Sequence, residues 1–148
     1  MKMLDRPLEI LLIEDNKGDV GLIEEIFNDA EIRINLHIAE DVEEAIRFLF
    51  SEDQFIGSPH PDIVILDWNL SKKDGCEVLK EIKENNNLKS IPVITLTTSS
   101  VETDIIRAYD LNTNAYIVKP IDFGKFMEVI GSVVDFWLKA VTLPPKKI

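Results

Sequence analysis

Charged and hydroxyl side chains stand directly after several short apolar runs of this chain. The clearest run is Ile63–Leu66, four consecutive apolar residues of which three are β-branched, and this pattern is typical of a strand buried on both faces. The run ends at Asp67. Because open α/β sheets bind their ligands at the carboxyl ends of parallel strands, Asp67 is the first candidate for chemistry.

Four further candidates follow other apolar runs in the same way. They are Glu14 and Asp15 after the first run, Thr97 after the fourth and Lys119 after the fifth. Each has an ordinary structural explanation, because an acidic pair can cap a helix, threonine is common in strands and a strand-end lysine is often exposed. Asp67 alone could simply begin a loop, since aspartate is common in turns. Their shared position after successive runs favours a single site.

The apolar periodicity predicts five strands that alternate with five helices. Strands are expected at 8–13, 34–38, 63–66, 92–96 and 115–118. Helices are expected at about 16–30, at 42–50 after a cap at Asp41, from a cap at Asp74 to 84, from a cap at Ser99 to 111, and at about 123–139. This alternation requires a parallel sheet with helices on both faces, because crossover connections are right-handed. We therefore expect a flavodoxin-like doubly wound (βα)5 α/β fold, a five-stranded sheet with strand order 2-1-3-4-5.

That strand order brings the candidate side chains to one edge of the sheet. The carboxylates of Glu14, Asp15 and Asp67 would repel one another there, and a bound cation would relieve the repulsion. Oxygen ligands without His or Cys favour a hard ion such as Mg²⁺. If a phosphoryl group is added to Asp67, Mg²⁺ and Lys119 would balance its negative charge, and the Thr97 hydroxyl would donate a hydrogen bond.

Length and composition narrow the possible classes of protein. The chain has 148 residues, so we expect one domain over 1–148, with its core at about 8–139, a short C-terminal tail and no output domain. The net charge of −11 disfavours direct nucleic-acid binding and indicates proteins or cations as partners. Cys76 is the only cysteine, which excludes an internal disulfide and a cysteine-based zinc site. No apolar segment is long enough to span a membrane, so we expect a cytoplasmic location.

Four short motifs resemble the receiver domain of two-component response regulators. They are ED at 14–15, ILDWNL at 65–70, LTT at 96–98 and YIVKP at 116–120. The resemblance implies that Asp67 is the phosphoacceptor. It implies Mg²⁺ ligands at Asp15, Asp67, the Asn69 backbone carbonyl and, through water, Glu14. It also implies switch and phosphoryl-binding roles for Thr97, Thr98, Tyr116 and Lys119, and a cis peptide bond before Pro120.

The same resemblance implies a stand-alone response regulator that receives a phosphoryl group from a sensor histidine kinase onto Asp67 in a phosphorelay. Such a protein is not an enzyme in the usual sense, although it takes part in its own Mg²⁺-dependent phosphorylation and dephosphorylation. Shifts of Thr97 and Tyr116 would remodel a face for a downstream protein partner. The stretch LSKKDGCEVL at 70–79 is similar to small regulators that are paired with phytochrome-type histidine kinases.

Three rival classes fit the residues less well. A flavin- or nucleotide-binding domain would need a phosphate loop rich in Gly, Ser or Thr after the first strand, where this chain has Glu14 and Asp15. A phosphatase of the haloacid dehalogenase type would need a second acid two residues after the nucleophile, where this chain has Asn69. A degenerate receiver used only for binding is unsupported, because no expected site residue is missing.

The expected fifth helix carries more apolar surface than one buried face needs. Its main apolar stripe comprises Phe123, Phe126, Met127, Ile130, Val134, Trp137 and Leu138, and a second stripe beside it comprises Val129, Val133 and Phe136. An apolar arc of about 200° exceeds the roughly 100° of one core-facing stripe. Either the tail that begins at Val141 covers the surplus, or the protein forms a homodimer through this helix and the neighbouring fifth strand, which we favour.

Overall fold

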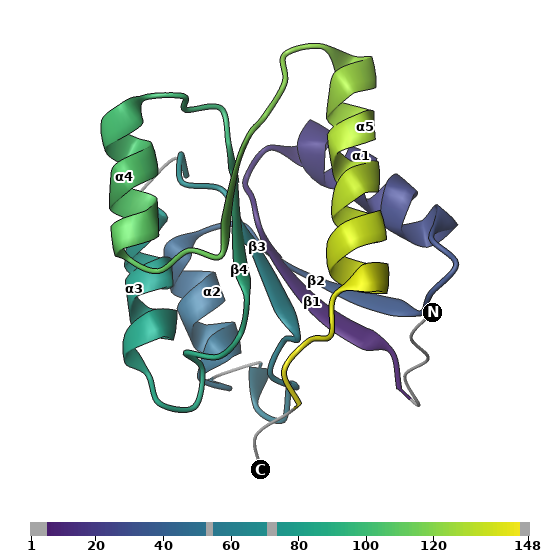
Figure 1. Cartoon of the computed structure of the whole chain (residues 1–148). Helices are drawn as coiled ribbons and strands as arrows, with labels where there is room; N and C mark the ends of the chain where they lie inside the picture. The colour runs from purple at the N-terminus through teal and green to yellow at the C-terminus, as the bar shows by residue number, and fades with distance from the viewer. Residues whose placement is uncertain (1–5, 53–54, 71–73, 146–148) are drawn as a thin grey trace.

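Residues 6–52, 55–70 and 74–145 are described by the computed structural model, which confirms the flavodoxin-like doubly wound fold (Figure 1). The strands form one sheet in the order β2-β1-β3-β4-β5, and every adjacent pair is parallel. The strands are β1 (Leu8–Ile13), β2 (Ile34–Ala39), β3 (Ile63–Leu66), β4 (Val93–Thr97) and β5 (Ala115–Val118). Each bound lies within one residue of its prediction.

Helices cover both faces of the sheet. They are α1 (Lys17–Asp29), α2 (Val42–Leu49), α3 (Cys76–Glu84), α4 (Glu102–Asp110) and α5 (Phe123–Val133). Figure 1 shows α1 and α5 on one face and α2, α3 and α4 on the other. Alternate residues of β1 follow this division, because Ile10 and Leu12 pack with the α1 and α5 side chains whereas Leu11 and Ile13 pack with those of α2 and α3. Both faces of β1 are therefore buried, which explains its apolar run.

Helix starts agree with the sequence only in part. The predicted cap at Asp41 is confirmed, because its carboxylate accepts a hydrogen bond from the backbone N–H of Glu44 at 2.7 Å. The predicted cap at Asp74 is also present, because its carboxylate accepts a hydrogen bond from the N–H of Cys76, the first residue of α3, at 3.0 Å. The predicted cap at Ser99 is wrong, since α4 has Val101 at its N-cap and no side-chain cap. The Ser99 hydroxyl instead donates to the Asp104 carboxylate at 2.6 Å, and α4 begins further along the chain.

The fifth helix changes its hydrogen-bonding pattern before it ends. The α-helix stops at Val133, and Val134–Ala140 continues as a π-helix, whose turns are wider. The N–H of Val141 donates to the carbonyl of Phe136, five residues back, at 2.9 Å. Residues 146–148 of the expected tail, and residues 71–73 of the LSKKDGCEVL stretch, lie outside the described residues. Within the described ranges, no helix combines the length and the hydropathy needed to cross a membrane.

Candidate functional site

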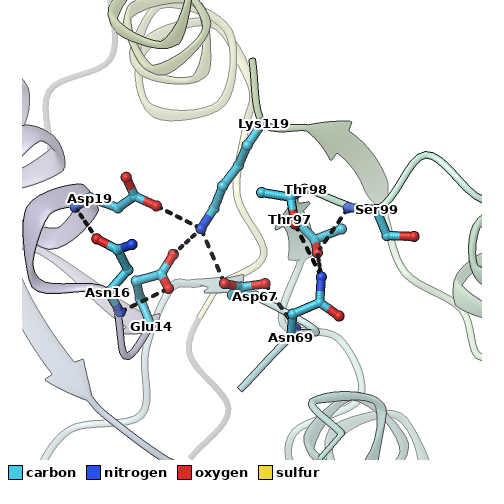
Figure 2. A network of polar contacts seen from close by, with 9 residues as sticks. All are labelled: Glu14, Asn16, Asp19, Asp67, Asn69, Thr97, Thr98, Ser99 and Lys119. Atoms are coloured by element: carbon cyan, nitrogen blue, oxygen red, sulfur yellow. Dashed lines mark hydrogen bonds and ion pairs between the residues drawn. The ribbon is translucent and has the colours of Figure 1, made fainter. Parts of the chain in front are cut away.

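The carboxyl ends of four strands bring the predicted site residues to one edge of the sheet (Figure 2). β1 and β3 are paired so that Ile13 lies opposite Leu66, and the N–H of Asp67 donates to the carbonyl of Ile13 at 3.0 Å. At the end of the pair β4 and β5, the N–H of Lys119 donates to the carbonyl of Thr97 at 2.7 Å. The parallel register thus places carboxylates, a hydroxyl and an ammonium group side by side.

The ammonium group of Lys119 contacts three carboxylates at once. Its Nζ atom donates to Glu14 Oε1 at 2.5 Å, to Asp19 Oδ2 at 2.8 Å and to Asp67 Oδ2 at 3.1 Å (Figure 2). Lys119, Glu14 and Asp67 are buried, and Asp19 is the most exposed of the four. We call Glu14, Asp19, Asp67 and Lys119 the ammonium cluster. An ammonium group has three hydrogens to donate, so Lys119 is saturated.

Burial and charge shift the pKa values in this cluster in opposite ways. Burial raises the pKa of Glu14 to about 7, and the negative charge of Asp67 adds to that rise although the Lys119 ammonium opposes it. For Lys119, burial alone would lower the pKa, but hydrogen bonds to Asp19 and Glu14 and the charge of Asp67 outweigh burial, so the pKa is raised. One lysine therefore stays charged but does not neutralise all the acids around it.

Three carboxylates form a group that fits a metal ion. One oxygen each of Glu14, Asp15 and Asp67 lies within 4.8 Å of the others. The donor set contains only oxygen atoms, which suits a hard divalent cation. The charges support the fit, because the single ammonium group of Lys119 is shared by the carboxylates of Glu14, Asp19 and Asp67. The sequence prediction that these acids converge is confirmed.

On the other side of Asp67 the contacts are between neutral groups. The Asn69 amide donates to the hydroxyl oxygen of Thr97 at 3.0 Å and to that of Thr98 at 3.3 Å (Figure 2). The Tyr116 hydroxyl donates to the backbone carbonyl of Ser99 at 2.9 Å, and burial raises the pKa of Tyr116. We call Asn69, Thr97, Thr98, Ser99 and Tyr116 the hydroxyl cluster. It joins the end of β3 to the loop after β4.

A tight backbone contact closes the loop that carries Asp67. The N–H of Gly75 donates to the carbonyl of Trp68 at 3.0 Å, and a Cβ atom at position 75 would lie 2.5 Å from the carbonyl oxygen of Asp67. This approach requires glycine. Arg107 of α4 reaches the same loop, because its guanidinium donates to the Asp74 carboxylate at 3.0 Å and lies 5.7 Å from the ring centroid of Trp68. Helix α4 is thereby attached next to Asp67.

The predicted cis peptide bond before Pro120 is wrong. The peptide bond between Lys119 and Pro120 is trans, and no peptide bond among residues 6–52, 55–70 and 74–145 is cis. The trans form of a bond before proline is intrinsically favoured by about 0.5–1 kcal/mol, and the short motif around Lys119 does not by itself reverse that preference.

Sequence reasoning also missed two residues next to the site. Neither Asp19 nor Arg107 is among the residues predicted for the site. A signal for Asp19 exists, because an acid in the first turn of a helix that starts at the site edge can reach that edge. Arg107 lies 40 residues after Asp67 in the sequence, and only the packing of α4 brings it to the loop that follows Asp67.

The sequence and the fold of this chain are similar to those of known proteins. The sequence profile of the Response regulator receiver domain family matches residues 10–131. The response regulator Rcp1 of Synechocystis sp. is 43% identical over 138 residues, which cover 93% of this chain and 94% of Rcp1. The crystal structure of the Mn²⁺-bound form of Rcp1 superposes with a TM-score of 0.91 at 42% identity and covers 94% of this chain and 100% of that chain. The phosphorylated cyanobacterial phytochrome response regulator RcpA superposes with a TM-score of 0.91 at 39% identity and covers 95% of this chain and 100% of that chain.

The chain therefore belongs to the response regulator receiver domain family. It is a response regulator of two-component signalling, which accepts a phosphoryl group rather than turning over a substrate as a classical enzyme does. The family match supports the receiver domain over a flavin- or nucleotide-binding domain and over a phosphatase. Such a regulator works with a histidine kinase as its partner.

Proposed function

We propose that Asp67 is the residue that accepts the phosphoryl group from a phosphohistidine of a sensor histidine kinase. One carboxylate oxygen of Asp67 forms a bond to phosphorus while the bond between phosphorus and the histidine nitrogen breaks, and the imidazole leaves with the electron pair. Asp67 suits this role because its Oδ1 accepts from the Asn69 N–H at 2.9 Å and its Oδ2 from Lys119 at 3.1 Å. Both contacts orient the carboxylate at the carboxyl end of β3.

The positions of Glu14, Asp15 and Asp67 support a metal site, and we assign it to Mg²⁺. Asp15, Asp67 and the backbone carbonyl of Asn69 would be the direct ligands, and Glu14 would act through water. The ion, when bound, would supply positive charge to the phosphoryl oxygens. Mn²⁺, which the crystal structure of Rcp1 contains, is also a divalent cation that prefers oxygen ligands.

The remaining site residues receive roles in the response to phosphorylation. Lys119 is placed to contact a phosphoryl oxygen, because its ammonium already touches Asp67. Thr97 and Thr98 would offer their hydroxyls to the phosphoryl group after releasing the Asn69 amide. Tyr116, held by the Ser99 carbonyl, would follow the movement of the loop after β4. The change would therefore reach α4, which follows this loop, and β5, which carries Tyr116.

Labelling with acetyl phosphate tests the assignment of Asp67. Intact-mass spectrometry of the wild-type protein with Mg²⁺ should show one added phosphoryl group, and Asp67→Asn should show none because the nucleophilic oxygen is gone. Asp110→Asn removes the same charge at an exposed position of α4 and should be labelled like the wild type. Retained labelling of Asp67→Asn would place the acceptor elsewhere.

We further propose that the cognate kinase is of the phytochrome type. The support is the similarity to RcpA, a cyanobacterial phytochrome response regulator, over nearly the whole chain. Phosphotransfer to this chain should then be faster from a phytochrome-type histidine kinase than from an unrelated one. Equal rates from both kinases would remove this part of the proposal.

We also propose a homodimer through α5 and the neighbouring edge of β5. Apolar side chains remain uncovered there, including Phe123 at 62% exposure, Phe136 at 58% and Val118 at 40%. Part of the second apolar stripe of the fifth helix is already covered, because Val133 is buried in the core and Val129 is half-buried. The tail covers another part, since Leu143 packs against the same core, but Phe136 stays exposed.

Sedimentation tests the dimer. Phe136→Asp places a charge in the proposed interface and should yield a folded monomer. Ile56→Asp changes an exposed apolar side chain that belongs to neither the fifth helix nor β5, and it should leave the dimer intact. A wild-type protein that is already monomeric at high micromolar concentration would reject the dimer.

A further inference from the structure

Asp19 reaches the reacting site from α1, outside the strand ends that supply the other groups. Its carboxylate lies 2.8 Å from Lys119 Nζ, which is closer than the 3.1 Å between Lys119 and Asp67 (Figure 2). Its backbone is held in place, because the N–H of Asp19 donates to the side-chain oxygen of Asn16 at 3.0 Å. Asp19 is therefore a fixed partner that draws the ammonium group toward α1.

The three carboxylates around Lys119 differ in what else they can bind. Glu14 and Asp67 belong to the group of acids that fits a metal ion, and Asp19 does not. A cation at that group would share the charge of Glu14 and Asp67 and weaken their hold on the ammonium. Asp19 would keep its contact. In the metal-loaded site, Asp19 is the carboxylate that competes for Lys119 with whatever is attached to Asp67.

A phosphoryl group on Asp67 needs the same ammonium hydrogens. Its oxygens lie beyond the Asp67 carboxylate, so Lys119 must follow them while all three of its donors are already taken. The negative charge of Asp19 also repels the dianionic phosphoryl group through space. Both effects oppose phosphorylation of Asp67.

We propose that Asp19 is a positioning residue that holds Lys119 on the α1 side of the site and competes with the phosphoryl group for it. Asp19 thereby sets the balance between the free and the phosphorylated protein. This inference rests on the proposed role of Asp67 as the phosphoacceptor. It assigns no direct chemistry to Asp19, which acts through Lys119.

The test measures the affinity for beryllofluoride, a mimic of the phosphoryl group, at saturating Mg²⁺. Trp68 fluorescence reports binding in a Trp137→Phe background, which leaves one tryptophan. Asp19→Asn should bind beryllofluoride about threefold more tightly or better, at the low end of the coupling between residues in contact. Glu25→Gln removes the same charge from an exposed position of α1 and should bind like the wild type.

The same change in a Lys119→Ala background separates a positioning role from a general effect of charge. Asp19→Asn should then give a clearly smaller gain in affinity, because the contact with Lys119 is gone and only the through-space repulsion by Asp19 remains. Lys119→Met serves as a second background if Lys119→Ala does not fold. An equal gain in affinity with and without Lys119, or no gain or a loss in the single variant, would overturn the inference.

Failure of the proposed function gives a different result. In that case the wild-type protein itself shows neither beryllofluoride binding nor labelling by acetyl phosphate, and both proposals are overturned together. A wild type that is labelled, with an Asp19→Asn variant that binds no better, overturns only the role of Asp19.

Discussion

The two sides of Asp67 are built from different interactions. The ammonium cluster joins buried charges, with Lys119 saturated by the carboxylates of Glu14, Asp19 and Asp67. The hydroxyl cluster joins neutral groups, and Asn69, which connects its two loops, is exposed to solvent. Buried charges cost several kcal/mol when one partner is lost, whereas a neutral hydrogen bond contributes about 0.5–1.5 kcal/mol.

This difference indicates which side of the site can rearrange. Moving Lys119 requires a replacement for its charge, so the ammonium cluster should respond to ions and to phosphoryl groups. The Asn69 amide can exchange a hydroxyl partner for water at little cost, because its side chain is exposed. The hydroxyl cluster is thus the part that can move when Asp67 is modified, and the ammonium cluster is the part that detects the modification.

Removing the central cation should have the largest effect on stability. Lys119→Ala leaves buried carboxylates without their partner and should lower the free energy of unfolding by about 3–5 kcal/mol in EDTA. The loss should be smaller with Mg²⁺, because the ion supplies positive charge to the same acids. Urea denaturation in both buffers measures the two values, with the exposed Lys125→Ala as control. Equal losses in EDTA and Mg²⁺ would show that Lys119 and the metal do not share the acids.

Adding Mg²⁺ to the wild type should have the next largest effect. At 100 times its dissociation constant, the ion should add about 2.7 kcal/mol to the free energy of unfolding, because it binds only the folded protein. Trp68 is buried beside Asp67 and beneath Arg107, so its emission should change with the ion in a Trp137→Phe background. Neither a higher melting temperature nor a fluorescence change at millimolar Mg²⁺ would argue against the metal site.

Disrupting the hydroxyl cluster should have the smallest effect. Asn69→Ala removes the amide that holds Thr97 and Thr98 but keeps the backbone carbonyl proposed as a metal ligand, so the free energy of unfolding should fall by about 1 kcal/mol or less. The same loss is expected in EDTA and in Mg²⁺, since no charge is removed. A loss as dependent on Mg²⁺ as that of Lys119→Ala would mean that the two clusters are not distinct.

Much of the fold and most of the site could be predicted from the sequence. The run Ile63–Leu66 predicts a buried strand by itself, and a parallel sheet then places Asp67 and the acidic pair at the same edge. The cap at Ser99 could not be predicted correctly, because its hydroxyl has both backbone and side-chain partners within reach. The conformation of the bond before Pro120 was also wrong, since its two forms differ by little in energy.

The sequence by itself determined the strands, their order and the kinds of groups at their ends, because apolar periodicity and strand connection rules act along the chain. Only the tertiary structure decided that Asp19 would share Lys119 with Glu14 and Asp67, and that Arg107 would attach α4 beside them. Those contacts depend on the placement of one helix against another strand end to within about an ångström. The reach of a side chain across such a gap follows from packing, and no local pattern encodes it.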